Sequence, residues 1–417
     1  MPRGPKGLVI RSYNVGFGDC HLLSFHYSRS EKHVLIDFGT TAKPKGASSD
    51  HMQRVADDIA TVTDGKLDAL VVTHRHRDHI SGFDGKTGKT IVALSPDVII
   101  QPWTEDPSAA TDARRAKNPV QRKNALMLQT LADMEMVAQN AQAMAQRARP
   151  RRASRWRELV DQLRFIGEEN IRNKGAVTTL MNMVADRRYV RAGNSAGLGR
   201  ILAGVKVHIL GPPTLEQSSA IEKYAKGSEQ EYWHLSGRAG DSAVAGKTPL
   251  ARFATKRVPE YARWFKRRMR DAYAAEVLEL VRELDDVLNN TSVILLFETQ
   301  GHKFLFPGDA QLENCQHALD EYKNLLRDVD LYKVGHHGSL NATPKSLWDL
   351  FVNKSKRETS NRLATLMSTM SGKHGSEAAS TEVPRRTLVE ALEKESDVYD
   401  TRDLAKDEMC WEIEYEF

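Results

Sequence analysis

An apolar run that ends in a histidine cluster constrains the fold of this chain more than any other feature. The segment LDALVVTH, residues 67–74, is followed at once by RHRDH. A short apolar run of this kind is typical of a strand that is buried on both faces, as in layered α/β proteins. The sequence therefore predicts a buried strand whose end carries polar side chains toward a site.

The cluster itself indicates a metal site. Its members are His74, His76, Asp78 and His79. A metal ion needs several lone-pair donors within about 2.0–2.2 Å of one point, and a turn after a strand can direct alternate side chains there. Imidazole and carboxylate groups together suit zinc, manganese or iron. The alternative is a polar loop rich in His and Arg, but so dense a cluster favours metal.

Two other predicted strand ends offer further ligands. The segment FLFPGDA places Asp309 after a strand, and YKVGHHGS does the same for His336 and His337. A Gly-Asp pair after a strand is usually only a turn. Together with the first cluster, these residues predict a site built from three strand ends.

The rest of the chain alternates between strands and helices. Short apolar segments predict strands at 7–15, 21–27, 32–40, 96–103, 205–213 and 409–417, a hairpin over 291–309, and helices over 51–64 and 384–395. Residues 105–195 are rich in Ala, Gln, Arg, Met and Leu, which is a helical composition. The pattern predicts an α/β fold with a helical insertion.

Composition indicates a globular, cytoplasmic protein. Of the 417 residues, 40% are hydrophobic and 28% are charged, which does not fit a disordered chain. The cysteines, Cys20, Cys315 and Cys410, are few and far apart, so a disulfide framework is not expected. The N-terminal apolar run is too short for a signal peptide, and no stretch approaches the roughly 20 apolar residues of a membrane span.

Basic residues gather in two segments, although the net charge is only +5. One segment lies within residues 107–165 and the other within 256–270. Such clusters form either a solvated helix face or a surface for nucleic acid. The candidate contacts to nucleic acid are Arg149, Arg151, Arg152, Arg267 and Arg268.

Several motifs resemble those of a known family. THRHRDH resembles the HxHxDH signature of the metallo-β-lactamase fold hydrolases, and NVGFGDCHLL, VLIDFG, the segment NNTSVILLFETQGHKFLFPGDA and LYKVGHHGS are similar to segments of the soluble domain of ComEC-type competence proteins. Bacterial phosphorylcholine esterases are relatives of that branch. The resemblance covers roughly residues 8–105 and 201–417, and residues 106–200 have no counterpart in it.

The resemblance implies a metallo-β-lactamase αββα sandwich with an Arg-rich helical insertion. Its first half would be residues 1–105, the basic insertion 106–200, and the second half 201–417, with a helical insert around 250–288. The insertion would be the part that binds nucleic acid or a protein partner. No membrane contact is expected.

The resemblance also implies a centre for two divalent ions, zinc or manganese. The ligands would be His74 and His76 for the first ion, Asp78 and His79 for the second, Asp309 bridging both, and one of His336 and His337 completing the second. Asp37 would orient a ligand histidine. The catalytic residues would be Asp78, His337 and His374.

The first metal position departs from the family. Many members have a further histidine upstream of the bridging aspartate, but this chain has Asn289 and Asn290 there, with Asn290 expected to support the site. His208 is an alternative ligand, although a lone histidine in a strand is more often structural. The first ion would therefore be held less tightly than the second.

The reaction implied is hydrolysis by water that the metal activates. No G-x-S-x-G elbow or phosphate-binding P-loop competes with this interpretation. The expected substrate is a phosphodiester in DNA or RNA, cut by a phosphodiesterase or nuclease. The alternatives are a small-molecule hydrolase, acting on a lactone, thioester or phosphocholine ester, and a binding module without enzymatic activity.

Overall fold

The chain divides into two compact units in the computed structural model. One comprises Met1–Ser108, Arg172–Thr214 and Leu288–Phe417, and the other comprises Ala109–Ile171 and Leu215–Val287. The residues described are 4–109, 173–183, 185–218, 286–339, 343–359, 361–373, 382–405 and 408–417, with isolated positions at 122–143, 278 and 284. The five candidate arginines and His374 lie outside the described residues.

The first unit contains a mixed sheet of seven strands in the order β13-β1-β2-β3-β4-β5-β6. The strands are β1 (Gly7–Tyr13), β2 (His21–His26), β3 (Glu31–Ile36), β4 (Ala69–Val71), β5 (Val98–Pro102), β6 (Asp186–Val190) and β13 (Cys410–Glu416). Neighbours from β13 to β3 pair antiparallel, and those from β3 to β6 pair parallel. The strand predicted before the histidine cluster is β4, and all its residues are buried.

A second mixed sheet has six strands in the order β12-β11-β10-β9-β8-β7. The strands are β7 (Lys206–Gly211), β8 (Ile294–Thr299), β9 (His302–Phe306), β10 (Leu331–Lys333), β11 (Ala364–Met367) and β12 (Asp397–Asp400). The predicted hairpin is confirmed as β8 and β9. Gln300 and Gly301 both have positive φ there, as the tight turn of a two-residue hairpin requires.

The two sheets share one hydrophobic core. Its buried side chains include Leu8, Leu23, Ile36, Val71 and Ile100 from the first sheet, and Ile209, Leu295, Phe306, Leu331 and Leu366 from the second. Alternate residues of each strand face this core, since side chains alternate across a sheet. The inner faces of the sheets therefore pack against each other.

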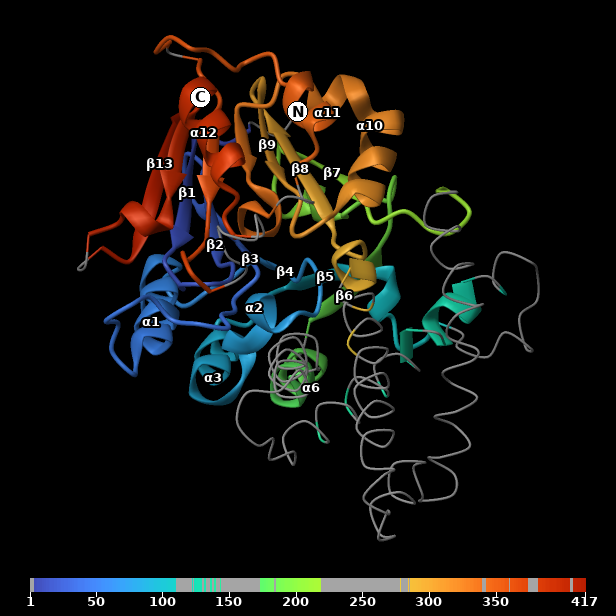
Figure 1. Ribbon diagram of the computed structural model, residues 1–417. Coiled ribbons are helices and arrows are strands. Elements are labelled where there is room, and N and C mark those ends of the chain that lie inside the picture. Colours follow the sequence, from blue (N-terminus) through green and yellow to red (C-terminus); the bar gives the residue numbers. More distant parts are fainter. Residues whose placement is uncertain are drawn as a thin grey trace, which may run out of the picture. The chain divides into compact units, whose positions relative to one another are not determined.

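Helices cover the outer face of each sheet (Figure 1). The helices α1 (His51–Val62), α3 (Gly85–Ala93) and α6 (Lys174–Asn182) pack on the first sheet, and α10 (Leu312–Leu326), α11 (Lys345–Leu350) and α12 (Arg386–Glu395) pack on the second. Buried contacts such as Val55 and Ile59 of α1 against Leu35 of β3 belong to the first of these outer cores. The result is an α/β sandwich, which confirms the α/β class.

One segment differs from its predicted structure. Residues 186–190 lie within the stretch predicted to be helical, but they form β6 at the edge of the first sheet. Arg187 donates to the backbone oxygen of Met183 at 2.8 Å, and Arg188 pairs with Asp186 at 2.6 Å. Charged side chains are common on edge strands, where they discourage pairing with another chain. This strand was not predicted because the composition of the surrounding residues is typical of helices.

The sandwich brings the predicted polar residues to the ends of its strands. Asp37 follows β3, His74 lies just beyond β4, Asp309 follows β9, and His337 follows β10. Within each sheet the strands concerned run parallel, so their carboxyl ends lie at the same edge. Among the described residues, no helix is long and apolar enough to cross a membrane.

Candidate metal centre

The loop after β4 is held by two turns that approach its backbone closely. Asp19 donates its amide to the backbone oxygen of Asp78 at 3.0 Å, and Phe38 donates to that of His79 at 2.9 Å. A Cβ at Gly39 would lie 2.5 Å from the carbonyl carbon of Asp78, which is closer than any real contact. A glycine at 39 is therefore needed for the short helix α2 (Arg77–Ile80) to sit where it does.

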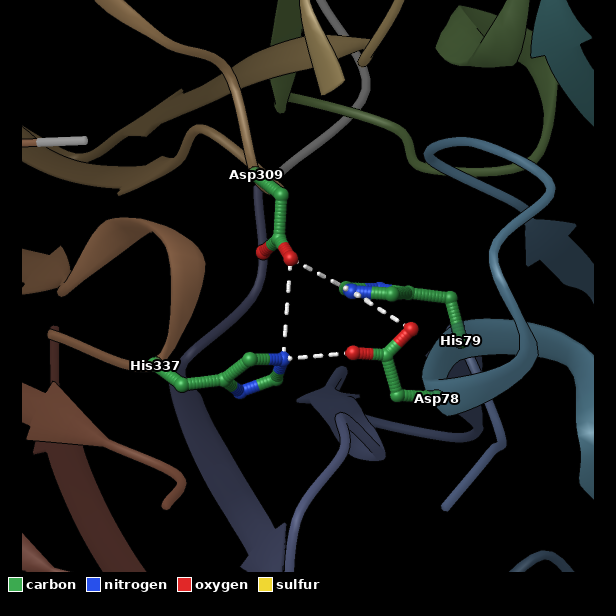
Figure 2. A group of neighbouring side chains, drawn as sticks. All are labelled: Asp78, His79, Asp309 and His337. Atoms are coloured by element: carbon green, nitrogen blue, oxygen red, sulfur yellow. Dashed lines mark hydrogen bonds and ion pairs between the residues drawn. The ribbon is translucent and has the colours of Figure 1, made fainter. Parts of the chain in front are cut away.

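Four side chains converge after these strand ends (Figure 2). They are Asp78, His79, Asp309 and His337, and each offers one ligand atom within 4.8 Å of the others. His79 Nε2 lies 2.9 Å from Asp309 Oδ2, and His337 Nε2 lies 3.0 Å from Asp78 Oδ2. The two imidazoles and two carboxylates are buried, so water competes little for these groups.

Both histidines are oriented by an acceptor behind the ring. His79 Nδ1 lies 2.8 Å from Asp37 Oδ2, and His337 Nδ1 lies 2.9 Å from the backbone oxygen of Ser368. An acceptor at Nδ1 places a proton on that nitrogen, which directs Nε2 of each ring toward the cluster. This is the arrangement that fixes metal-ligating histidines in proteins. The predicted orienting role of Asp37 fits this geometry.

The backbone at the site is unusual. Asp37, His336 and His337 have φ values of 56°, 40° and 54°, in the left-handed region. Residues other than glycine adopt this region rarely, at a cost of about 1–3 kcal/mol, and such residues gather at functional sites. The left-handed pair at 336–337 turns the chain sharply after β10, so that one of two adjacent histidines faces the cluster.

The charges of the cluster are strongly coupled. Burial alone would lower the pKa of His79 and of His337, but the carboxylate of Asp309 and other nearby acids raise both pKa values above normal. Burial would raise the pKa of Asp78 and of Asp309, yet attraction to the rings holds both below normal. Without metal, protons on His79 and His337 therefore supply the positive charge that a bound cation would otherwise supply.

This coupling predicts that metal affinity rises with pH. Because the pKa values of His79 and His337 are raised in the fold, their contribution to stability is full below about pH 6.5 and is lost as pH rises through the raised values. A metal ion must displace these protons, so affinity should grow up to about tenfold per pH unit for each proton released. Calorimetry with Mn²⁺ in buffers of different ionisation enthalpy measures that release. An affinity that is flat between pH 6 and pH 8 would contradict the prediction.

His74 and His76 lie beside this group rather than within it. The ring of His74 is 4.1 Å from that of His79 and 4.7 Å from that of His76, measured between centroids. Burial keeps the pKa of His74 well below normal and lowers that of His76 to about 4. Both rings are therefore neutral at pH 7, which is the state that binds a metal. The buried Nε2 of His74 has no hydrogen-bond partner among the described residues.

The structure separates the two adjacent histidines after β10. His337 is fully buried and belongs to the cluster, whereas His336 is partly exposed and lies outside it. The Nδ1 of His336 is 3.0 Å from the hydroxyl of Ser339. Sequence reasoning left this choice open, and the geometry favours His337 as the ligand.

The other candidates take supporting positions. Asn290 accepts the amide of Gln311 at 3.2 Å and donates to Glu313 at 2.8 Å, so it holds the start of α10, just after Asp309. The neighbouring Asn289 is fully buried, and its amide has no hydrogen-bond partner among the described residues. His208 pairs with Glu298 at 2.9 Å across β7 and β8, which gives it a structural role.

Two buried residues of the site were missed from the sequence. Asp19 lies in the turn before β2, and Lys333 ends β10, each with 1% of its side chain exposed. They form an ion pair with each other. Asp19 follows a glycine in the same way as Asp309, which was the available signal, whereas a single lysine near a strand end gives none.

Comparison with known proteins gives one partial similarity. No family model matches the chain. A stretch of 55 residues, 13% of the chain, is 40% identical to ComE operon protein 3 of Bacillus subtilis (strain 168). That stretch covers 7% of the B. subtilis protein, so the similarity concerns a small part of it.

Proposed function

We propose that this protein is a metal-dependent hydrolase of the metallo-β-lactamase fold that acts on phosphodiesters in DNA or RNA. The observation that carries the proposal is the buried group of Asp78, His79, Asp309 and His337, whose ligand atoms face one another. The motifs in the loops, the α/β sandwich and the partial similarity to a ComE operon protein support it.

The residues present fit a divalent metal. Oδ1 of Asp78 and Nε2 of His74 are buried, and neither has a hydrogen-bond partner among the described residues. Leaving such atoms unsatisfied is costly unless a ligand completes them. Imidazole nitrogen with carboxylate oxygen is a donor set for zinc or manganese. A bound divalent ion would supply activation of water and neutralisation of charge on the phosphoryl oxygens.

The protein's own residues would orient the ligand histidines and donate a hydrogen bond to the substrate. Asp37 and the Ser368 carbonyl hold the rings of His79 and His337, so little reorganisation is needed at the moment of reaction. His336 is partly exposed, lies outside the cluster and contacts the hydroxyl of Ser339, so it is the histidine left for the substrate side. Although part of the residue is exposed, the protein packed around it removes water from the ring and lowers its pKa to about 4. At neutral pH the ring is therefore uncharged and can donate a hydrogen bond through one nitrogen.

The proposed substrate class rests on phosphate chemistry and on charge. A phosphodiester carries a negative charge, and the basic segments at 107–165 and 256–270 would attract a nucleic-acid backbone. Turnover of bis(p-nitrophenyl) phosphate and of single-stranded DNA or RNA with Mn²⁺ or Zn²⁺ tests this. Turnover of lactones, thioesters or phosphocholine esters alone would contradict the phosphodiesterase and favour a small-molecule hydrolase.

The variant that tests the site is Asp78→Asn, and its matched control is Asp349→Asn. Asp78 would lose a metal-binding charge, and we expect kcat/KM to fall by at least about 100-fold. Asp349 lies on α11 with 76% of its side chain exposed, so the same change there should leave turnover unaltered. Equal activity of the two variants would remove Asp78 from the site. Metal-free protein with full activity would contradict metal-dependent hydrolysis.

A further inference from the structure

A buried lysine lies against the candidate metal centre, and the proposed hydrolysis makes no use of it. Lys333 Nζ forms an ion pair with Asp19, lies 3.4 Å from Asp309 Oδ1 and donates to the backbone oxygen of Gly308 at 3.3 Å. A buried ammonium is costly unless carboxylates compensate it. A cation in this position must therefore be matched to the acids around it.

The two oxygens of Asp309 face different partners. Oδ2 lies 2.9 Å from His79 Nε2 and 3.5 Å from His337 Nε2, so it faces the cluster. Oδ1 lies by Lys333 and accepts the amide of His336 at 3.2 Å. One oxygen is thus directed toward the metal position, and the other is engaged by donors of the chain itself.

Asp19 lies behind the two histidine rings, on the Nδ1 side that faces away from the cluster. Its Oδ2 lies 3.8 Å from His79 Nδ1, and its Oδ1 lies 3.7 Å from His337 Nδ1. Asp19, Asp37 and His79 form a second group whose ligand atoms lie within 4.8 Å of one another. The ion pair with Lys333 supplies the positive charge that this second acidic group needs.

We propose that Lys333 is a positioning residue that acts as a built-in cation of the metal centre. It restricts Asp309 to binding metal through Oδ2 alone, and it balances the charge of Asp19 behind the histidine rings. The inference rests on the proposed metal centre but not on the substrate. In Lys333→Met, Oδ1 of Asp309 keeps only the amide of His336 as a donor and the acidic group loses its charge partner, so a bound metal should gain coordinating oxygens.

Full-length protein loaded with Co²⁺ tests the proposal through its visible absorption spectrum and its thermal unfolding. Lys333→Met should show a weaker d–d absorption per bound Co²⁺ than the wild type, because the ion has a higher coordination number. Its Tm without metal should fall, because two buried carboxylates lose their partner. Added Co²⁺ should then raise its Tm by more than it raises that of the wild type, because metal replaces the missing charge.

If Lys333 has only a structural role, the expected changes in Tm and in the spectrum are different. Lys333→Met would then lower the Tm equally with and without Co²⁺ and would leave the spectrum unchanged, and this result would overturn the proposal. The double variant Lys333→Met with Asp19→Asn removes both charges of the pair and should recover part of the lost stability. If the single variant does not fold, the double variant decides: an altered spectrum supports the proposal, and a wild-type spectrum overturns it.

The test separates this inference from the proposed function. No substrate enters the measurement, so a wild type that binds Co²⁺ but cleaves no phosphodiester contradicts only the proposed substrate. A wild type that binds no Co²⁺ contradicts the metal centre and the role of Lys333 together.

Discussion

Asp309→Asn is expected to abolish tight metal binding and hydrolysis together. Asp309 faces both histidines of the cluster through Oδ2 and faces Lys333 through Oδ1. Loss of its charge removes a ligand and leaves Lys333 with one carboxylate fewer. We expect metal affinity to fall by at least about 100-fold, measured by calorimetry with Mn²⁺, and the metal-free protein to lose thermal stability.

Asp68→Asn is the control for that variant. Asp68 is equally buried and is also paired with a lysine, Lys32, at 2.7 Å. It lies just before β4, whereas the loop that carries Asp78 and His79 follows that strand. This change should lower the Tm and leave metal affinity and turnover unaltered. If Asp68→Asn weakens metal binding as strongly as Asp309→Asn does, the loss reflects general destabilisation, and Asp309 is not a ligand.

Gly39→Ala is expected to damage the centre without touching a ligand. The added Cβ would lie 2.6 Å from the backbone oxygen of Asp78 and 2.6 Å from the carbonyl carbon of His79, so α2 must move. Overpacking of this kind costs about 1–3 kcal/mol of stability. Misplacing two adjacent ligands should lower metal affinity by about 10–100-fold, the size of effect seen when ligand support is lost.

Gly199→Ala gives the matched comparison. Gly199 is exposed, its φ is not positive, and an added Cβ there meets no atom within 4 Å. It should change neither metal affinity nor Tm by a measurable amount. A Gly39→Ala protein that binds Mn²⁺ as tightly as Gly199→Ala would show that the close packing on α2 does not position the ligands.

The main strands and the central residues of the site could be predicted from the sequence, because their signals are local and strong. An apolar strand followed by the histidine cluster is recognisable by itself, and β4 is found where it was predicted. The contact between His79 and Asp309 spans 230 residues, yet it was anticipated. Both residues follow buried strands, and the ends of buried strands tend to converge in layered α/β proteins.

Other features depend on contacts that no local pattern encodes. His336 and His337 are adjacent and chemically identical, and only the left-handed backbone after β10 decides which ring faces the cluster. Lys333 is an ordinary residue in the sequence, and its role comes from Asp19, which lies more than 300 positions away in the chain. Strand β6 was not predicted because its charged residues resemble those of the preceding stretch, whose composition predicts a helix.

The central claim is that these four side chains hold a divalent metal. Anomalous X-ray scattering from crystals grown with Mn²⁺ or Zn²⁺, recorded on both sides of the metal absorption edge, tests it most directly. We predict a peak within about 2.0–2.2 Å of ligand atoms from Asp78, His79, Asp309 and His337. A second, weaker peak beside His74 and His76 would fit a less tightly held first ion. Fully loaded crystals with no peak among those four side chains would contradict the account.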